Sequence, residues 1–270
     1  MTNRGLEAHG PIGKGGGAGL SVIVITKNEE AVIRRCLESV QWADEIIVVD
    51  SGSTDDTLKI AEELNAKTYV TPDWPGPGPQ RNRAVSHATK EWILALDADE
   101  WVSPELRDEI LAVIESPGDR VGYRIPRLSS FCGRFMRHGG WWPDYVSRLF
   151  RRGSARYSDG LVHDHLLVEG AMGTLKQHLS HEAFRDLEEV LDKMNAYSTP
   201  GALMLHQNNR RGSLATAIAH GLWTFFRTYV LRAGFLDGRE GFMLAISNAE
   251  GTYYKYLKLM LLPEKSVNRE

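Results

Sequence analysis

Four short apolar runs alternate with helix-like segments over residues 20–102, and this rhythm restricts the fold more than any other feature. Between the first two runs, apolar residues recur with helical spacing from Val32 to Val40. Short apolar runs bounded by polar residues are typical of buried strands. Strands that alternate with helices form right-handed βαβ units, so the sequence predicts an α/β fold with a mostly parallel sheet flanked by helices. The four runs are Leu20–Ile25, Glu45–Asp50, Lys67–Val70 and Trp92–Leu96.

Polar residues follow three of these runs. Thr26 follows the first, Asp50 ends the second, and Asp97, Asp99 and Glu100 follow the fourth. Ligands of open α/β sheets bind beyond the carboxyl ends of the strands, so these side chains are expected at one edge. Two aspartates separated by one residue can hold Mg²⁺ or Mn²⁺, since these ions favour carboxylate and phosphate oxygens. The alternative is that Asp97 and Asp99 only end a strand and cap the next helix.

Local signals predict where several helices start. Thr26-Lys-Asn-Glu29 resembles a capping box, and Ser53 is expected to cap a helix that runs to about Leu64. A helix over about Gln80–Ala88 precedes the fourth run. Ser103, followed by Pro104 at the first helical position, predicts a further helix start. The inward face of that helix is expected to hold Leu106, Ile110, Leu111 and Ile114.

The pattern changes after residue 122, where short β segments and turns continue to about Val168. The expected strands are Tyr123–Leu128, Ser147–Phe150 and Leu166–Val168. After Phe184 the spacing is helical, and the segments Leu214–Leu231 and Phe242–Leu262 carry many aromatic residues beside arginine or lysine. Aromatic stripes at helical spacing are mostly core, which is one interpretation. The other is a surface that lies on an anionic membrane without crossing it.

Composition restricts the class of protein. The chain has 270 residues and a net charge of -3, so bulk charge does not indicate a nucleic-acid-binding protein. Cys36 and Cys132 form neither a metal motif nor a disulfide framework, which favours a reducing compartment. No secretory signal and no run of membrane-spanning length is predicted. Residues 1–19 are rich in glycine and are predicted to be a disordered tail.

Charge is uneven along the chain. Between Arg120 and Arg156 there are nine arginines and one acid, Asp144. The guanidinium group binds phosphates and carboxylates bidentately, so this segment is a candidate for binding an anionic ligand. A solvated basic face is the alternative.

Four motifs occur in order in the first half, and together they resemble family 2 glycosyltransferases, which have a GT-A fold. The motifs are Thr26-Lys-Asn-Glu29, Asp50-Ser-Gly-Ser-Thr-Asp55, Gln80-Arg-Asn-Arg-Ala84 and Leu96-Asp-Ala-Asp99. Later segments resemble the branch of glucosyltransferases that act on lipopolysaccharide core. These segments are Trp141-Trp-Pro, Arg148-Leu-Phe-Arg-Arg152, Leu161-Val-His-Asp164, Phe225-Phe-Arg-Thr-Tyr229 and Gly234-Phe-Leu-Asp-Gly238.

The resemblance implies a domain organisation. A GT-A catalytic domain is expected over residues 20–183, with a nucleotide-sugar-binding half over 20–102 and an acceptor half over 103–183. Residues 184–270 are expected to form a C-terminal helical extension.

The resemblance also implies which residues bind the donor. Thr26 and Glu29 would lie near the nucleoside, Asp50 would accept a hydrogen bond from uracil N3–H, and Arg81 would lie near the base and the phosphates. Asp97 would approach the ribose. A carboxylate suits the N–H donor of a base, although Asp50 is also a common residue of turns.

A Mg²⁺ or Mn²⁺ cofactor follows from the same resemblance, with Asp99 holding the ion on the diphosphate. UDP is a poor leaving group until a cation neutralises its developing charge. His181 in Ser180-His-Glu182 is the candidate to complete the coordination. A separate zinc site is the alternative for the histidines, which are His163, His165, His178 and His181.

Inversion at the sugar carbon requires a base on the face opposite UDP. The family places an acid after the mixed β region, often as Glu-Asp, and the positional match here is Val162-His-Asp164. Asp164 is therefore the expected base. His163 stands where the family has Glu, so Asp144 and His163 compete with Asp164 for this role, and a loop carboxylate is the structural alternative.

The prediction is an inverting, metal-dependent glycosyltransferase. It would move a hexose, glucose from UDP-glucose, onto lipopolysaccharide core or another anionic, lipid-linked glycan. It would be cytoplasmic and peripheral on the inner face of the cytoplasmic membrane, with no nucleic-acid partner. A nucleotidyltransferase is one alternative, although it would need a basic glycine-rich loop where Thr26 to Glu30 is acidic. A non-catalytic module that binds sugar nucleotides or membranes is the other.

Overall fold

Four parallel strands, in the order β3-β2-β1-β4, form the first half of a mixed sheet. They are β1 (Leu20–Thr26), β2 (Glu45–Asp50), β3 (Lys67–Val70) and β4 (Trp92–Asp97). Each coincides to within one residue with an apolar run, because the runs end where polar side chains begin. The structure is a computed structural model that describes residues 18–158 and 165–262.

The sheet continues beyond β4 with β8, β6, β12 and β5. The strand β8 is antiparallel to both β4 and β6, whereas β12 runs parallel to β6 and antiparallel to β5. The sheet is therefore parallel in its first half and mixed in its second. The later strands are β5 (Glu100–Val102), β6 (Arg120–Phe131), β7 (Arg134–Phe135), β8 (Asp144–Arg151), β9 (Ala155–Tyr157), β10 (Leu166–Val168), β11 (Ala171–Thr174) and β12 (Leu179–Phe184).

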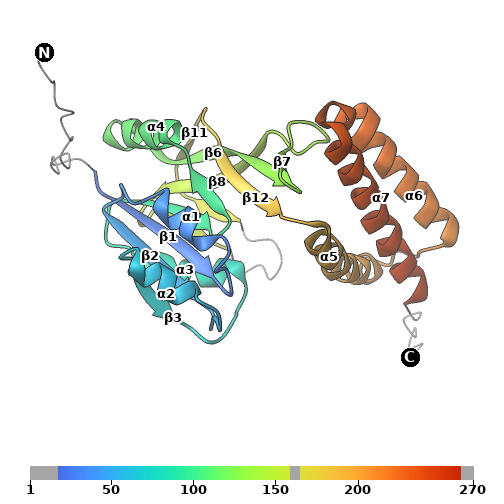
Figure 1. The fold of residues 1–270 in the computed structure, drawn as a ribbon, viewed down its shortest axis with the longest axis horizontal. Coiled ribbons are helices and arrows are strands. Elements are labelled where there is room, and N and C mark those ends of the chain that lie inside the picture. Colours follow the sequence, from blue (N-terminus) through green and yellow to red (C-terminus); the bar gives the residue numbers. More distant parts are fainter. Residues whose placement is uncertain (1–17, 159–164, 263–270) are drawn as a thin grey trace, which may run out of the picture.

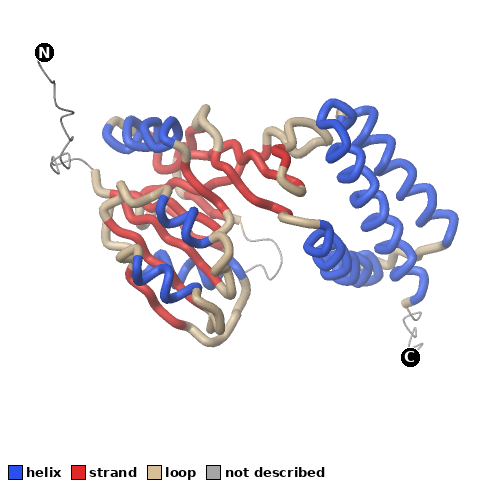
Figure 2. Tube along the Cα trace, in the orientation of Figure 1, coloured by secondary structure: helices blue, strands red, loops and turns tan. Residues whose placement is uncertain are grey.

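Helices flank the sheet, and further helices lie beyond one end of it. The first four are α1 (Ile33–Glu38), α2 (Thr57–Glu63), α3 (Pro77–His87) and α4 (Pro104–Glu115). Three long helices follow the sheet and lie together at the end opposite the N-terminus (Figure 1). Figure 2 shows the same division, with the strands on one side and the long helices on the other. The long helices are α5 (Leu187–Gln207), α6 (Leu214–Phe226) and α7 (Gly238–Leu261), with a π-helical turn, η1 (Arg227–Leu231), and a 3₁₀ turn, η2 (Gly234–Asp237), between α6 and α7.

Alternate residues of each central strand enter different cores. In β1, Val22 and Val24 pack with α1 and α4, whereas Ile23 packs with α3 on the opposite face. The same alternation places Val48 on the first face and Ile47 on the second. Side chains of a strand point to opposite faces in turn, so a strand covered on both faces must be apolar throughout. This explains the continuous apolar runs and confirms the predicted α/β fold.

Two predicted helix caps are wrong. The helix after β1 begins at Ile33 with no side-chain cap, so Thr26 and Glu29 do not form a capping box. Ser53 does not cap α2, which begins at Thr57, because its hydroxyl instead bonds the carboxylate of Asp50. The Ser53 hydroxyl bonds within its own turn, and the Thr26 hydroxyl is buried at the end of β1 without a partner among the described residues.

The helix α4 follows its prediction more closely. Ser103 accepts a hydrogen bond from the Leu106 backbone N–H at 3.2 Å, which confirms it as the cap. Leu106, Ile110 and Ile114 are buried, but Leu111 is 37% exposed and was wrongly expected to face inward.

The C-terminal helices form a separate layer joined to the sheet through β12 and α5. A small core at this junction contains Phe131, Met136, Val190 and Leu244. The predicted helix over Leu214–Leu231 is α-helical only to Phe226 and then continues as η1. Within the part of the chain that the structure describes, no helix has the length and apolar content needed to cross a bilayer.

Candidate functional site

Three parallel strands bring their carboxyl ends to one edge of the sheet. The strand β1 lies between β2 and β4, with Thr26 paired in register with Asp50 and Ile25 paired with Asp97. The structure therefore places Thr26, Asp50 and Asp97 side by side, although they come from distant parts of the sequence. Asp99 follows Asp97 in the turn before β5.

Asp50 organises the turn that follows β2. One carboxylate oxygen, Oδ1, accepts the backbone N–H groups of Gly52 and Ser53, each at 2.8 Å. The other, Oδ2, accepts the Ser53 hydroxyl. Asp50 has no exposed surface in this arrangement, so its hydrogen bonds are those of a turn aspartate.

Thr26 ends the neighbouring strand β1, and Glu29 lies on the loop that follows it. The hydroxyl of Thr26 is buried and has no hydrogen-bond partner among the described residues. The backbone N–H of Glu29 donates to Thr57 Oγ1 at 2.8 Å, which ties this loop to α2. Burial raises the pKa of the Glu29 carboxyl to about 7, and the negative charge of Asp99 adds to the rise. Glu29 is thus close enough to Asp99 for their charges to interact.

Asp97 is held between two arginines. Arg81 of α3 bonds one of its carboxylate oxygens, and Arg148 of β8 bonds the other. Burial alone would raise the pKa of Asp97, but the charges of Arg148 and Arg81 outweigh it and hold the pKa well below its ordinary value. Asp97 is consequently an oriented carboxylate, able to accept hydrogen bonds from a ligand.

A network of ion pairs extends from Asp97 into the second half of the sheet. Arg148 also bonds Glu100 Oε1 at 2.8 Å, and Arg127 lies 3.2 Å from the same oxygen. The other terminal nitrogen of Arg127, Nη2, pairs with Asp144 Oδ2 at 2.7 Å. Glu100 is fully buried, and its second oxygen accepts the backbone N–H of Asp97 at 2.9 Å. The network therefore fixes the backbone of the segment that carries Asp97 and Asp99.

Asp99 and His181 face each other across paired strands. His181 lies in β12 opposite Glu100 of β5, and its Nε2 is 3.4 Å from Asp99 Oδ2. The other ring nitrogen, Nδ1, is 2.8 Å from the hydroxyl of Ser129. A hydrogen bond from Nδ1–H to that hydroxyl leaves the lone pair of Nε2 available to a metal ion.

The Asp99 and His181 pair fits a divalent cation. Oδ1 of Asp99 is buried, with no hydrogen-bond partner within the described ranges. Burying a carboxylate oxygen without a partner costs free energy, which a cation at this position would recover. Mg²⁺ and Mn²⁺ are held mainly by carboxylate and phosphate oxygens, so Asp99 would be the principal protein ligand and His181 a second one. No third His, Cys, Asp or Glu in residues 18–158 and 165–262 gathers with them.

Other predicted site residues are dispersed or not described. His178 packs edge-on against Trp142, with ring centroids 6.0 Å apart, while His165 lies beside a cavity at Asp97. The described histidines therefore do not assemble a zinc site. Asp164 and His163 lie outside the described residues. Asp144, the competing base, stands at the start of β8 with its carboxylate half-exposed and paired with Arg127.

Two cavities flank the ion-pair network. One, of about 360 Å³, is lined by Arg81, Asp97, Arg148 and Tyr157. The other, of about 450 Å³, is lined by Arg127, Asp144, His181 and residues that lead toward α5. Asp97 and His181 thus stand beside separate cavities that share Arg127.

The arginine-rich segment has mainly structural partners. Arg151 pairs with Glu91 at 2.7 Å, and Arg134 lies 3.9 Å from Glu240. Arg127 and Arg148 alone among the nine belong to the network around Asp97 and Glu100. The sequence pattern indicated an excess of arginine here, but it could not distinguish these two from the others.

Comparisons with known proteins agree on one family. The family model described as Glycosyl transferase family 2 matches residues 21–166. A Rickettsia typhi protein named as an uncharacterized glycosyltransferase is 33% identical over 261 residues, covering 92% of this chain and 89% of that protein. The lipopolysaccharide core biosynthesis glycosyltransferase LpsC of Rhizobium meliloti is 29% identical over 246 residues, covering 85% of this chain and 87% of its own.

Among solved structures, the S. aureus protein TarS 1-349 in complex with UDP has 19% sequence identity and a TM-score of 0.47. The match covers 88% of this chain and 90% of that one. A likeness at this level carries no conclusion about the ligands of the present chain.

Proposed function

The chain belongs to family 2 of the glycosyltransferases, and on this premise we propose that it is an inverting, metal-dependent hexosyltransferase. It uses UDP-glucose as donor and transfers glucose to the core of lipopolysaccharide or to another lipid-linked glycan. The name of LpsC, which refers to lipopolysaccharide core biosynthesis, supports this class of acceptor. Family membership favours this activity over that of a nucleotidyltransferase or a non-catalytic module.

The observation that carries the proposal is the pairing of Asp99 with His181 beside the edge where the parallel strands end. These two residues would hold Mg²⁺ or Mn²⁺, which when bound neutralises charge on the diphosphate leaving group. Among the buried side-chain atoms of the described residues that have no hydrogen-bond partner, Asp99 Oδ1 is the only carboxylate oxygen, which supports a cation at this position.

The donor residues act by binding and orientation. Asp97, fixed by Arg81 and Arg148, would accept hydrogen bonds from the ribose hydroxyls. A carboxylate has about four lone-pair sites, and three hydrogen bonds within the turn already occupy Asp50. Because Asp50 has no exposed surface, uracil N3–H would reach it by replacing the Ser53 hydroxyl. Thr26 and Glu29 would border the nucleoside.

Asp164 remains the proposed base, with Asp144 and His163 as its competitors. Asp144 pairs with Arg127 at 2.7 Å, so one of its carboxylate oxygens is already engaged within the protein. If Asp164 is the base, Asp164→Asn abolishes transfer and leaves binding of UDP-glucose unchanged, whereas Asp144→Asn retains measurable transfer. The reverse result would assign the role to Asp144.

We assign catalysis to residues 20–183, with donor binding in 20–102 and acceptor binding in 103–183, and treat 184–270 as a helical extension. The extension would hold the enzyme on the inner face of the cytoplasmic membrane. Nineteen of the 25 exposed large apolar side chains in the described residues lie between Leu187 and Leu261. Residues 208–236 contain four arginines and no acid, which suits an anionic lipid surface.

Vesicle flotation tests the membrane contact. Binding should require phosphatidylglycerol and fail with phosphatidylcholine alone. Trp223→Glu should reduce flotation, whereas Trp74→Glu should not, because Trp74 is equally exposed but lies in the donor half. Equal recovery with both kinds of vesicle would exclude the electrostatic contribution.

Calorimetry tests the donor half. UDP-glucose, UDP-galactose, UDP-N-acetylglucosamine and GDP-mannose are titrated with and without Mn²⁺ into the wild type, Asp99→Ala and Asp119→Ala. The exposed Asp119 provides the matched control. Manganese-dependent binding of UDP-glucose that is lost only in Asp99→Ala is the expected result. Absence of binding by every donor would refute the proposal, and turnover that survives in Asp99→Ala would refute the role of that residue.

A further inference from the structure

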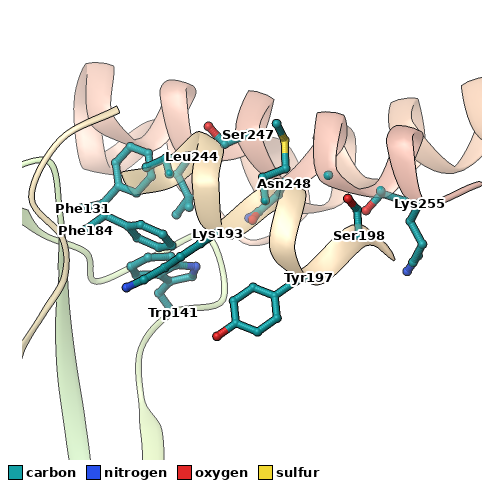
Figure 3. A pocket seen from close by; sticks show the side chains of 14 residues that line it. Phe131, Trp141, Phe184, Lys193, Tyr197, Ser198, Leu244, Ser247, Asn248 and Lys255 are labelled. Atoms are coloured by element: carbon teal, nitrogen blue, oxygen red, sulfur yellow. The ribbon is translucent and has the colours of Figure 1, made fainter. Parts of the chain in front are cut away.

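A third cavity lies beyond the proposed active site, where the sheet meets the C-terminal helices. Its volume is about 300 Å³, and its lining comes from the end of the sheet, from α5 and from α7 (Figure 3). It shares four residues with the cavity of about 450 Å³ that contains His181 and Asp144. The shared residues are Trp141, Phe184, Lys193 and Tyr197. The two cavities are therefore neighbours with a common wall.

One end of this cavity is aromatic. Trp141 contacts Phe131 edge-on and lies tilted against Phe184, with ring centroids 6.0 Å apart in each pair. Phe131 is fully buried, whereas Tyr197 of α5 is 63% exposed. The packed rings hold Trp141 in position as an apolar surface, and the exposed ring of Tyr197 lines the same cavity. Such surfaces suit the C–H faces of sugar rings, which are flat and apolar on one side.

The lining also contains polar groups, and its only charged side chains are positive. None of the fourteen lining residues is acidic, and two are lysines, Lys193 and Lys255. Ser247, Asn248 and Thr252 of α7 add hydroxyl and amide groups to the lining. Hydroxyl and amide groups match sugar hydroxyls, and ammonium groups match phosphates or carboxylates.

Lys193 is the charged group nearest the active site. It lies on the wall shared by both cavities, beside Trp141 and Phe184 (Figure 3). Its ammonium donates one hydrogen bond, to the Ala183 carbonyl at 2.8 Å, and sits 4.8 Å from the centre of the Phe184 ring. An ammonium group has three N–H donors, so two are left to bind an anion.

We propose that this cavity binds a negatively charged sugar of the acceptor, stacked on Trp141 and Tyr197 and paired through its phosphate or carboxylate with Lys193. The inference rests on the proposed function, because it makes the cavity the extension of the acceptor site that contains His181. The C-terminal helices thereby select the acceptor. A neutral glycan lacks the group that Lys193 recognises and binds more weakly.

Binding can be measured at the cavity itself through methionine methyl groups. Met194 lines the cavity, whereas Met172 lies on β11 beside Gly122. The ¹³C-methyl signal of Met194 therefore reports binding in the cavity, and that of Met172 is the control for effects elsewhere. The probes are glucose 6-phosphate, glucuronic acid, glucose and inorganic phosphate, each titrated in the presence of UDP and Mn²⁺. Glucose 6-phosphate or glucuronic acid should shift Met194 and leave Met172 unchanged, and the tighter of the two identifies the anionic group.

Three substitutions test the role of Lys193. Lys193→Met should raise the Kd of the preferred anionic sugar about ten- to a hundredfold, the usual effect of losing a charge-assisted hydrogen bond. Lys193→Arg should restore binding, because the charge is kept. Lys176→Met, an exposed lysine outside the cavity, should change nothing. Calorimetric titration of UDP should give the same affinity in all three variants, which shows that the donor half is intact.

The outcomes separate this proposal from the proposed function. If inorganic phosphate shifts Met194 as strongly as the anionic sugars, or if no probe shifts it, the cavity is not a sugar site and the proposal fails. A Lys193→Met variant that binds as tightly as the wild type also overturns it. Failure of UDP to bind the wild type refutes the proposed function instead, and is measured independently of the Met194 signal.

Discussion

Arg148 is the residue whose replacement tests the ion-pair network most directly. Its guanidinium group is buried between Asp97 and Glu100, and it bonds both carboxylates. Arg148→Met keeps most of the apolar volume and removes the charge. In the variant, Arg81 still pairs with Asp97 and Arg127 still lies 3.2 Å from Glu100. The variant therefore has one buried positive charge fewer and the same number of carboxylates.

The size of the effect follows from burial. Removing one partner of a buried ion pair leaves an uncompensated charge and costs about 3–5 kcal/mol. For a chain of this size that loss corresponds to a fall in Tm of about 6–20 °C. Arg151, three residues further along β8, provides the matched control, since it pairs with Glu91 at 2.7 Å but both side chains are nearly half-exposed. Exposed pairs of this kind contribute about 0–1 kcal/mol.

Thermal unfolding followed by circular dichroism, without ligand, measures both variants. Arg148→Met should lower the Tm strongly and Arg151→Met by less than about 4 °C. Adding Glu100→Gln to Arg148→Met should recover part of the loss, because the double variant no longer buries one negative charge in excess of the positive charges. If Arg148→Met is no less stable than Arg151→Met, the network does not support the fold and our account of Asp97 is wrong.

Three further predictions concern other parts of the chain. The pKa of Glu29 is about 7 in the folded protein against an ordinary 4.5, so the folded state binds this proton more tightly than the unfolded state. Stability from this group is therefore present below pH 4.5 and lost as the pH rises to about 7. Glu29→Gln should reduce the fall in unfolding free energy between pH 5 and pH 8, by at most about 3 kcal/mol, as measured by urea titration. An unchanged pH dependence would contradict this. Ser103→Ala should cost about 1 kcal/mol by the same assay, because it removes the cap on the Leu106 N–H. Gly241→Ala should destabilise the C-terminal helices, since an added Cβ would collide with the Gly234 carbonyl oxygen, and circular dichroism at 222 nm should show an earlier loss of helix; a variant as stable as the wild type would mean that η2 can move.

The strands β1, β2 and β4 of the donor half could be predicted because they are buried on both faces. A strand covered on both sides must be apolar at every position, and it ends where polar residues begin. The predicted run Glu45–Asp50 is therefore β2, and Trp92–Leu96 is β4 without its final residue. The four ordered motifs likewise identified the family from residues 20–102 alone, and the family model matches residues 21–166.

Helix starts and side-chain roles near the loops were predicted less well. Ser53 and Thr26 had the spacing of helix caps, but the folded chain brings Ser53 to Asp50 and leaves the Thr26 hydroxyl buried. A hydroxyl bonds whichever donor or acceptor comes close, and sequence spacing shows only the local choices.

The sequence by itself determined the α/β half, the edge at which Thr26, Asp50 and Asp97 would meet, and the family. These depend on local apolar periodicity and on motifs that are continuous in the chain. Only the tertiary structure decided that Arg148 and Arg127 are the arginines that support this edge. It also decided that His181 faces Asp99 and that Lys193 borders a cavity against α7. Such contacts join residues far apart in the chain, and strand pairing and helix packing, which no short segment encodes, bring them together.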